Sequence, residues 1–209
     1  MAPCFVVAIV LITLCCLIFI KPERVVLQKQ KVNLPPQKTI IYLLLFAYSI
    51  LIVFRGIPYW TGIIVMPLFL LFMDRDALKA VDYPLLLTFV FFFVFAGNMA
   101  RIDVVREFFS YLLSKNTLVV SVLSCQVISN VPSAVLLSQF TNNYADLLVG
   151  VNIGGAGTLI ASLASLITFR EYAKHNPTKF KHYIVTFSLF NFGFLAVLTL
   201  FALVWNTVF

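Results

Sequence analysis

The sequence predicts an all-α integral membrane protein with about six transmembrane helices, one re-entrant helical hairpin and one broken helix. Two observations lead to this fold class. First, 62% of the 209 residues are hydrophobic and 11% are charged, so the chain carries more apolar surface than a water-soluble core of this size buries. Second, uncharged stretches recur along the chain, and most of them approach the ~20 residues that a spanning helix needs.

The uncharged segments give the predicted elements in chain order. Proline or glycine stands beside charged residues at several boundaries, as at Lys21-Pro22 and Asn176-Pro177, where a helix cannot continue. Six segments read as ordinary spans and one is unusual. In order they are 4–20, 39–54, 56–73, 83–100, 116–143, 147–169 and 183–209.

The first segment, 4–20, stands where a signal peptide would stand, but its flanks favour a retained helix. No basic residue precedes it, and no small-residue cleavage site ends it. Basic residues follow it, as expected when the C-terminal end of the helix is cytoplasmic. These residues are Lys21, Arg24, Lys29 and Lys31.

Charge and cysteine usage exclude other classes of partner. The net charge of +7 arises from Lys and Arg in short connections and not from one basic face, so we expect the lipid bilayer as partner and no nucleic acid. The cysteines lie in apolar stretches without CxxC spacing or a nearby His, so they are expected to pack and not to bind metal. They are Cys4, Cys15, Cys16 and Cys125.

Segment 116–143 is unusual because its centre, from Gln126 to Ser133, is polar and contains proline. Pro132 cannot donate a backbone hydrogen bond and disfavours helical geometry at Val131, so two half-helices are expected. Arms of about 12 residues reach ~18 Å, roughly half way across the hydrocarbon core. The tip should therefore lie near the membrane midplane, where it must be buried or line a wet cavity.

The distribution of Lys and Arg predicts that segment 116–143 returns to the side it entered from. A full crossing would put seven of them on one side and eight on the other, which is no bias. A hairpin puts eleven on the cytoplasmic side and four outside, as the positive-inside rule requires. We therefore expect the N-terminus outside and a hairpin that opens outward. The eleven are Lys21, Arg24, Lys29, Lys31, Lys38, Arg75, Lys79, Arg170, Lys174, Lys179 and Lys181, and the four are Arg55, Arg101, Arg106 and Lys115.

A second interruption is predicted in segment 147–169. Four glycines fall within eight residues, 150–157, and each lowers helix preference by about 1 kcal/mol relative to Ala. We expect the helix to unwind there and to resume at Thr158. A role in close helix packing stays open for the stripe of small residues, which is formed by Gly150, Gly154, Gly157, Ala161 and Ser165.

The two interruptions together indicate a site made of dipoles. Secondary transporters direct half-helix N-termini at anionic groups and coordinate a small cation with freed carbonyls. Ser133 and Thr158 are expected to begin helices whose N-H groups face such a site, and Ser129, Asn130 and Asn152 would add neutral ligands. Segments 116–143 and 147–169 contain no Asp, Glu, Lys, Arg or His, which argues against a buried-carboxylate pump and against an enzyme.

Three stretches resemble the second half of permeases of the ion transporter superfamily: SNVPSA at 129–134, NIGGAGTLIAS at 152–162 and FAGNMARI at 95–102. This superfamily includes citrate-transporter-like permeases, divalent anion:sodium symporters and arsenical pump membrane proteins. The resemblance covers 35–209 and implies one repeat of an inverted-repeat transporter. Residues 1–34 would then be the last helix and linker of a missing first half.

By this resemblance the hairpin tip and the broken helix bind the substrate between them. The tip would be formed by Ser129, Asn130 and Pro132, and the partner break by Asn152, Gly154, Gly155, Gly157 and Thr158. The coupling ion would be Na⁺, held by carbonyls near Asn130 and Gly154, or H⁺. Dicarboxylate-transporting relatives carry Ser-Asn-Thr at the tip, whereas this chain has Ser-Asn-Val followed by Pro, which leaves a carboxylate, arsenite or another anion open as substrate.

The resemblance implies ion-coupled secondary transport of a small anion across a bacterial-type plasma membrane. The chain would work as half of a permease, with a first-half repeat or a full-length partner, and as a homodimer. Two alternatives stay open. One is an inert or assembly-only fragment of a truncated permease, and the other is a Na⁺/H⁺ antiporter of the same superfamily, which the uncharged breaks disfavour.

Overall fold

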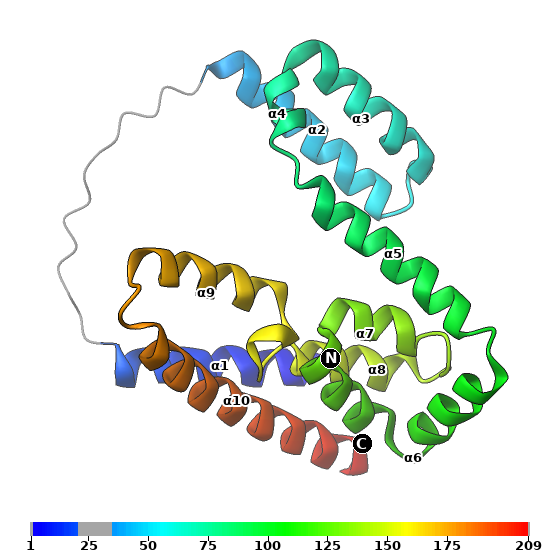
Figure 1. Cartoon of the computed structure of the whole chain (residues 1–209), viewed down its shortest axis with the longest axis vertical. Helices are drawn as coiled ribbons and strands as arrows, with labels where there is room; N and C mark the ends of the chain where they lie inside the picture. The colour runs from blue at the N-terminus through cyan, green and yellow to red at the C-terminus, as the bar shows by residue number, and fades with distance from the viewer. Residues whose placement is uncertain (1, 21–34, 209) are drawn as a thin grey trace. The chain divides into compact units, whose positions relative to one another are not determined.

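The computed structural model describes residues 2–20 and 35–208, and every regular element in these ranges is helical (Figure 1). The predicted all-α class is therefore confirmed. The predicted linker within 1–34, with its four basic residues, lies outside the described residues. The elements are α1 (Ala2–Phe19), α2 (Pro36–Val53), α3 (Tyr59–Met73), α4 (Arg75–Lys79), α5 (Tyr83–Met99), α6 (Asp103–Ile128), α7 (Asn130–Leu137), α8 (Tyr144–Gly154), η1 (Leu159–Ala161), α9 (Leu163–His175) and α10 (Phe180–Val208).

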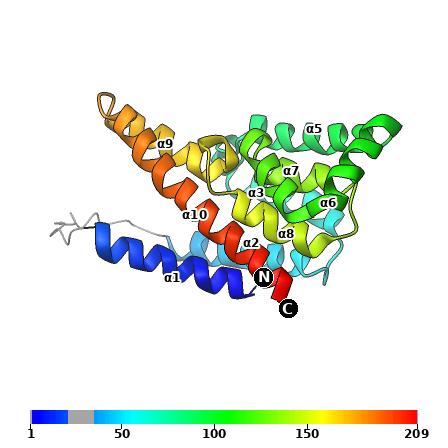
Figure 2. The same ribbon diagram turned by 90° about the horizontal axis from the view of Figure 1, so that it is seen from below.

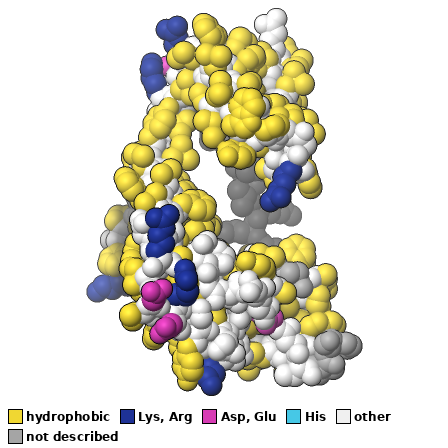
Figure 3. Space-filling model, turned by 90° about the vertical axis from the view of Figure 1, so that its right-hand side faces the viewer, with side chains coloured by type: hydrophobic (Ala, Val, Ile, Leu, Met, Phe, Trp, Pro, Cys, Tyr) yellow, Lys and Arg dark blue, Asp and Glu magenta, His cyan; other side chains and the backbone are white. Residues whose placement is uncertain are grey.

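Much of the helix surface is apolar. Among the described residues, α1, α2, α6 and α10 are long and apolar enough to cross a membrane, and α3, α5 and α8 are apolar but shorter. Large hydrophobic side chains point outward, as at Phe54, which is 81% exposed. Figure 3 shows hydrophobic side chains over much of the visible surface, with Lys and Arg in small groups. This surface needs lipid as its solvent, while the predicted count of six spans stays a prediction.

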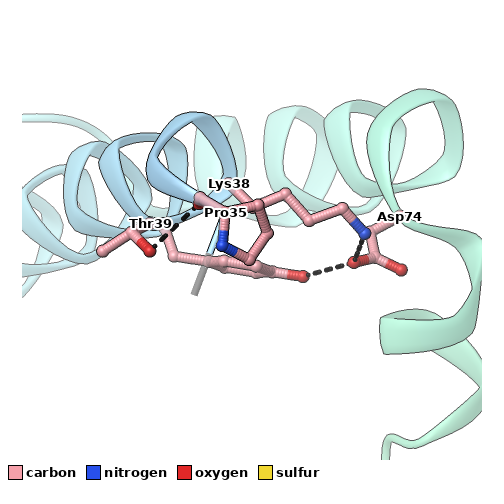
Figure 4. A network of polar contacts seen from close by, with 5 residues as sticks. Pro35, Lys38, Thr39 and Asp74 are labelled. Atoms are coloured by element: carbon pink, nitrogen blue, oxygen red, sulfur yellow. Dashed lines mark hydrogen bonds and ion pairs between the residues drawn. The ribbon is translucent and has the colours of Figure 1, made fainter. Parts of the chain in front are cut away.

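Helices α2 to α4 form a compact unit of their own, in which α2 and α3 run antiparallel. Near the connection, the Tyr48 hydroxyl donates to Thr61 Oγ1 at 2.8 Å. At the other end, one Asp74 oxygen accepts from Lys38 Nζ and from the Tyr42 hydroxyl, each at 3.0 Å (Figure 4). The bond from Lys38, followed by that from Tyr42, lowers the pKa of the Asp74 carboxyl below its usual 3.8.

Helix α1 and the chain from Leu86 onward form the other compact unit. Its centre is the antiparallel pair of α6 and α7. The hydroxyls of Ser124 and Ser133 lie 3.0 Å apart near the tip, while the rings of Phe109 and Phe140 stack at 5.1 Å near the open end. The chain thus turns back at Ser129, as the hairpin prediction requires, and its re-entrant position in a membrane stays a prediction.

The first arm of this hairpin begins at Asn116, inside α6. Asn116 has a non-helical backbone, with φ −163° and ψ 98°, and its side-chain oxygen accepts from the Val119 N-H at 3.0 Å. This bond caps a new helix start within α6. The boundary predicted at 116 therefore coincides with a kink, although the helix on its N-terminal side extends back to Asp103.

The second arm begins at Asn130, and the expectation that it begins at Ser133 was wrong. Pro132 does not delay the helix, because its missing N-H falls within the first turn, where donors have no intrahelical acceptor. The Ser133 N-H already bonds to the Ser129 carbonyl at 3.1 Å. Ser133 is therefore inside the arm.

Segment 147–169 is broken as predicted, in two steps. Helix α8 ends at Gly154, the 3₁₀ turn η1 spans Leu159–Ala161, and Ser162 is extended before α9 begins at Leu163. The expectation that the helix resumes at Thr158 was wrong for α9, because Thr158 caps η1 by accepting from the Ala161 N-H at 3.2 Å. Helices α1 and α10 lie side by side against this region (Figures 1 and 2).

Candidate functional site

The side chain of Gln126 joins the hairpin to the broken helix. Its Nε2 donates to the carbonyl oxygens of Gly154 at 2.9 Å and Ala156 at 3.1 Å, and also to Val122 in its own helix at 3.1 Å. Its Oε1 accepts from the Thr158 N-H at 2.9 Å. The Thr158 N-H can bond only to the oxygen of the Gln126 amide and the three carbonyls only to its nitrogen, so these partners determine which way the amide is turned.

These bonds satisfy backbone groups that the two interruptions leave without helical partners. The Gly154 carbonyl belongs to the last residue of α8 and the Ala156 carbonyl lies just after it, while the Gln126 carbonyl belongs to the last turn of α6. The Thr158 hydroxyl donates to this Gln126 carbonyl at 3.1 Å. The hydroxyl of Ser129 donates to the Ala161 carbonyl at 3.3 Å. The two breaks therefore complete one another's hydrogen bonds.

Asn130 lies at the point where the two breaks meet. A Cβ added to Gly155 would lie 3.1 Å from Asn130 Nδ2, so the amide of Asn130 lies directly against the Gly155 backbone. The side-chain oxygen of Asn130 accepts from the Val131 N-H at 2.9 Å. Its Nδ2 group, half-buried beside the break, can still donate to a ligand.

Two glycines of the broken helix allow close packing. A Cβ at Gly150 would lie 2.7 Å from the Leu118 carbonyl oxygen, and one at Gly154 would lie 2.8 Å from Cys125 Cβ and Sγ. The packing role left open for the small-residue stripe therefore holds at these two positions. Gly157 has φ +110°, and a Cβ there would collide with Gln126 Oε1, so this position requires glycine.

Asn152 is not brought to the tip. Its Nδ2 donates to the Leu148 carbonyl at 2.7 Å on the exposed side of α8. It lines a cavity of about 460 Å³ whose other walls come from α1, α8 and α10. Residues two apart on a helix face nearly opposite sides, so Asn152 points away while Gly154 packs on α6.

The remaining predicted residues, Pro132 and Ser133, lie in the body of the hairpin. Pro132 is buried and lines an apolar cavity of about 300 Å³ together with Phe92, Phe95 and Phe109. Ser133 is 0% exposed and pairs with Ser124. Both residues pack inside the hairpin, and neither directs a polar group toward the point where the two breaks meet.

What remains at the meeting point is a small set of neutral donors. Helix α9 begins one residue after Ser162, and Ser162 follows Ala161, whose carbonyl bonds to Ser129. The first-turn N-H groups of α9 therefore lie next to the hairpin tip, where a helix dipole favours an anion. The described residues contain no cluster of His, Cys, Asp or Glu that could hold a metal ion.

The sequence placed Gln126 within the polar tip but gave it no role. The available signal was its position one turn before the break. A long side-chain amide there can reach the carbonyls and N-H groups that an unwound partner helix exposes. The sequence alone could not identify that partner.

The chain is 42% identical over 131 residues to the protein described as "Uncharacterized transporter MJ0456" of Methanocaldococcus jannaschii, a match covering 63% of this chain and 36% of the relative. It is 30% identical over 112 residues to "Inner membrane protein YbiR" of Escherichia coli, covering 52% and 30% respectively. This chain is an integral membrane protein related to a transporter. No family model matches it, and no solved structure matches it.

The matches leave the larger part of each relative without a counterpart. The matched part of this chain spans about a third of the length of both curated relatives. The relatives' descriptions support a role in membrane transport and carry no substrate, ion or site residue. The anion and its coupling therefore belong to the proposal that follows.

Proposed function

We propose that the chain carries out ion-coupled secondary transport of a small anion, as one repeat of an inverted-repeat permease. The observation that supports this proposal is the meeting of two backbone interruptions. Ser129 bonds to Ala161, and Asn130 lies against Gly155. A transport site of this kind is made of peptide dipoles and neutral side chains.

The anion would bind between the Asn130 amide and the N-terminus of α9. Both offer N-H donors, and the positive end of the α9 dipole favours a negative charge. Thr158 and Gly154 have a different role, because their backbone groups are already bonded to Gln126. Asn152 lies outside this site, since it faces α1 and α10. The proposal therefore centres binding on Asn130.

The second half of the site would come from another repeat, because inverted-repeat transporters bind substrate between their two repeats. A first-half repeat, a full-length partner or a homodimer could supply it. If no partner activates the chain, the inert or assembly-only alternative holds. The neutral breaks disfavour the antiporter, which needs a carboxylate or other proton carrier at its centre.

Binding and uptake test the proposal. The purified full chain is reconstituted in proteoliposomes, alone and after co-expression with the part of the archaeal relative that this chain does not match. Uptake and anion-dependent thermal stabilisation are measured for citrate, succinate, phosphate, sulfate and arsenite under a Na⁺ or H⁺ gradient. We expect at least one anion to be taken up with the partner present.

Asparagine variants give this experiment its specificity. Asn130→Ala should abolish uptake and anion-dependent stabilisation. Asn152→Ala should retain both. Asn191→Ala is the matched control, because Asn191 bonds to the Phe187 carbonyl within α10. Absence of any anion response in both preparations, or full activity in Asn130→Ala, contradicts the proposal.

A further inference from the structure

Three carbonyl oxygens converge on one nitrogen at the centre of the hairpin–helix junction. They belong to Val122, Gly154 and Ala156, and all lie 2.9–3.1 Å from Gln126 Nε2. A primary amide has only two hydrogens to donate. Because three carbonyl oxygens surround two hydrogens, one hydrogen is shared between two oxygens. The amide nitrogen therefore has one more acceptor than it needs.

Such convergence is the geometry that unwound carbonyls give to a small cation in broken-helix sites. Carbonyl oxygens directed at one point repel each other unless a positive group lies between them. Here the partial positive charge comes from the amide Nε2 group, which reaches the point from α6. The Thr158 N-H bonded to Oε1 fixes the direction of the amide from the other side.

We propose that the Gln126 amide takes the place of a monovalent cation among these carbonyls and so holds the hairpin tip against the broken helix without a bound ion. Gln126 is then a positioning residue for the proposed anion site. The Gly154 carbonyl is not a Na⁺ ligand, and a coupling ion, where transport needs one, binds outside this junction. Only this last statement rests on the proposed function.

The surrounding residues are built to accommodate the amide. Gly157 adopts φ +110° with no side chain, and any Cβ there would collide with Gln126 Oε1. The Thr158 hydroxyl returns to the Gln126 carbonyl at 3.1 Å, so both the side chain and the backbone of Gln126 are bonded to the break. A side chain at 126 without this amide would leave the Gly154 and Ala156 carbonyls without this donor, which is costly away from water.

Cys125 reports on this junction directly. It is 0% exposed, and a Cβ at Gly154 would lie 2.8 Å from its Sγ, so alkylation of the thiol requires the hairpin and the broken helix to separate. The other cysteines are replaced by alanine (Cys4→Ala, Cys15→Ala and Cys16→Ala). The rate of Cys125 alkylation is then measured for the full chain in lipid nanodiscs, at constant ionic strength, in choline, sodium, potassium or ammonium chloride.

In this background the parent chain should be alkylated slowly and at the same rate in all four salts. Gln126→Ala opens a space lined by the three carbonyls and should be alkylated about tenfold faster in choline. Ammonium or sodium should slow that rate several-fold by entering the space. Gln126→Met fills the space without donors, so it should be alkylated quickly in every salt.

Gln139→Ala is the matched control, because Gln139 is exposed beyond the end of α7, and it should behave like the parent. The proposal is overturned if Gln126→Ala behaves like this control, if no cation slows its alkylation, or if Gln126→Met responds to cations equally. It is also overturned if sodium slows alkylation of the parent chain, a test that needs no variant at position 126. None of these alkylation rates depends on transport, so the proposal on Gln126 and the proposed transport function can fail independently of one another.

Discussion

The hydroxyl oxygens of Ser124 and Ser133 lie 3.0 Å apart and join the two arms of the hairpin one turn behind its tip. Ser133 is 0% exposed, so its hydroxyl cannot exchange this partner for water. A buried hydroxyl keeps its position only while it is paired. The pair therefore fixes the register of α6 against α7.

Removing this pair should destabilise the hairpin. We expect Ser133→Ala to lower the free energy of unfolding by about 1 kcal/mol, the usual net value of one hydrogen bond. Unfolding in detergent is followed through Trp205, with Trp60→Phe in the background. A double-mutant cycle with Ser124→Ala should show positive coupling, whereas Ser114→Ala, whose hydroxyl bonds to the Tyr111 carbonyl, should show no coupling with Ser133→Ala.

Close packing of α8 on α6 gives a second prediction. Gly154→Ala puts a Cβ 2.8 Å from both Cys125 Cβ and Sγ, a contact that the backbone of neither helix can relieve locally. We expect Gly154→Ala to lower the free energy of unfolding by about 1–3 kcal/mol, as at other overpacked sites. A Cβ added to Gly193 in α10 would have nothing within 4 Å, so Gly193→Ala should raise the free energy of unfolding by up to ~1 kcal/mol. Equal effects of the two substitutions would contradict the packing role of Gly154.

The sequence predicted the interruptions because their causes are local. Pro132 and its polar neighbours interrupt the helix of segment 116–143, and four glycines interrupt the helix of segment 147–169, whatever these residues pack against. The exact helix starts were not predictable in the same way. Asn130 begins α7 and Leu163 begins α9, and the residues beside these starts are held by bonds between positions 32 residues apart in the chain, Gln126 with Thr158 and Ser129 with Ala161.

The orientation of side chains was predicted less well than the breaks. Asn152 was grouped with the tip because it lies beside the glycines in sequence, yet it faces α1 and α10. Helical periodicity already separates positions two apart, so this assignment could have been refined. The role of Gln126 could not, since it depends on which carbonyls the folded chain brings to it.

The cluster at Asp74 gives a prediction on pH. The pKa of Asp74 is lowered by its bonds to Lys38 and Tyr42, so the charged form is favoured in the folded unit. The stabilisation is therefore fully present above the ordinary value of 3.8 and is lost as pH falls through the lower, folded-state pKa. Asp74 is exposed to solvent screening, so the effect should be small and sensitive to salt.

The measurement compares the parent chain with Asp74→Asn. Trp60, in α3, reports thermal unfolding of this unit when Trp205 is replaced by Phe. We expect the parent to unfold at a higher temperature at pH 6, and the difference to shrink toward pH 3. Asp76→Asn is the control, because Asp76 pairs with Lys79 within the short helix α4. A difference that persists unchanged at pH 3 would show that charge at Asp74 is not its source.

The hairpin tip holds backbone strain that a substitution can release. Ser129 has φ 72° and ψ 159°, a backbone conformation that residues other than glycine adopt only at a cost of about 1–3 kcal/mol. Ser129→Gly removes this cost but loses the bond to the Ala161 carbonyl, while Ser129→Ala loses the bond and keeps the strain. We expect Ser129→Gly to be more stable than Ser129→Ala by ~1–3 kcal/mol.

Arg55 offers the matched control for this comparison, since it also has a positive φ, 58°, but lies in the other compact unit. Arg55→Gly should raise stability reported by Trp60 and leave the Trp205 signal unchanged, whereas Ser129→Gly should act only on the Trp205 signal. If Ser129→Gly and Ser129→Ala unfold alike, the tip is not strained. The hydrogen bonds of Gln126 and of the Ser129 hydroxyl would then hold the tip against the broken helix.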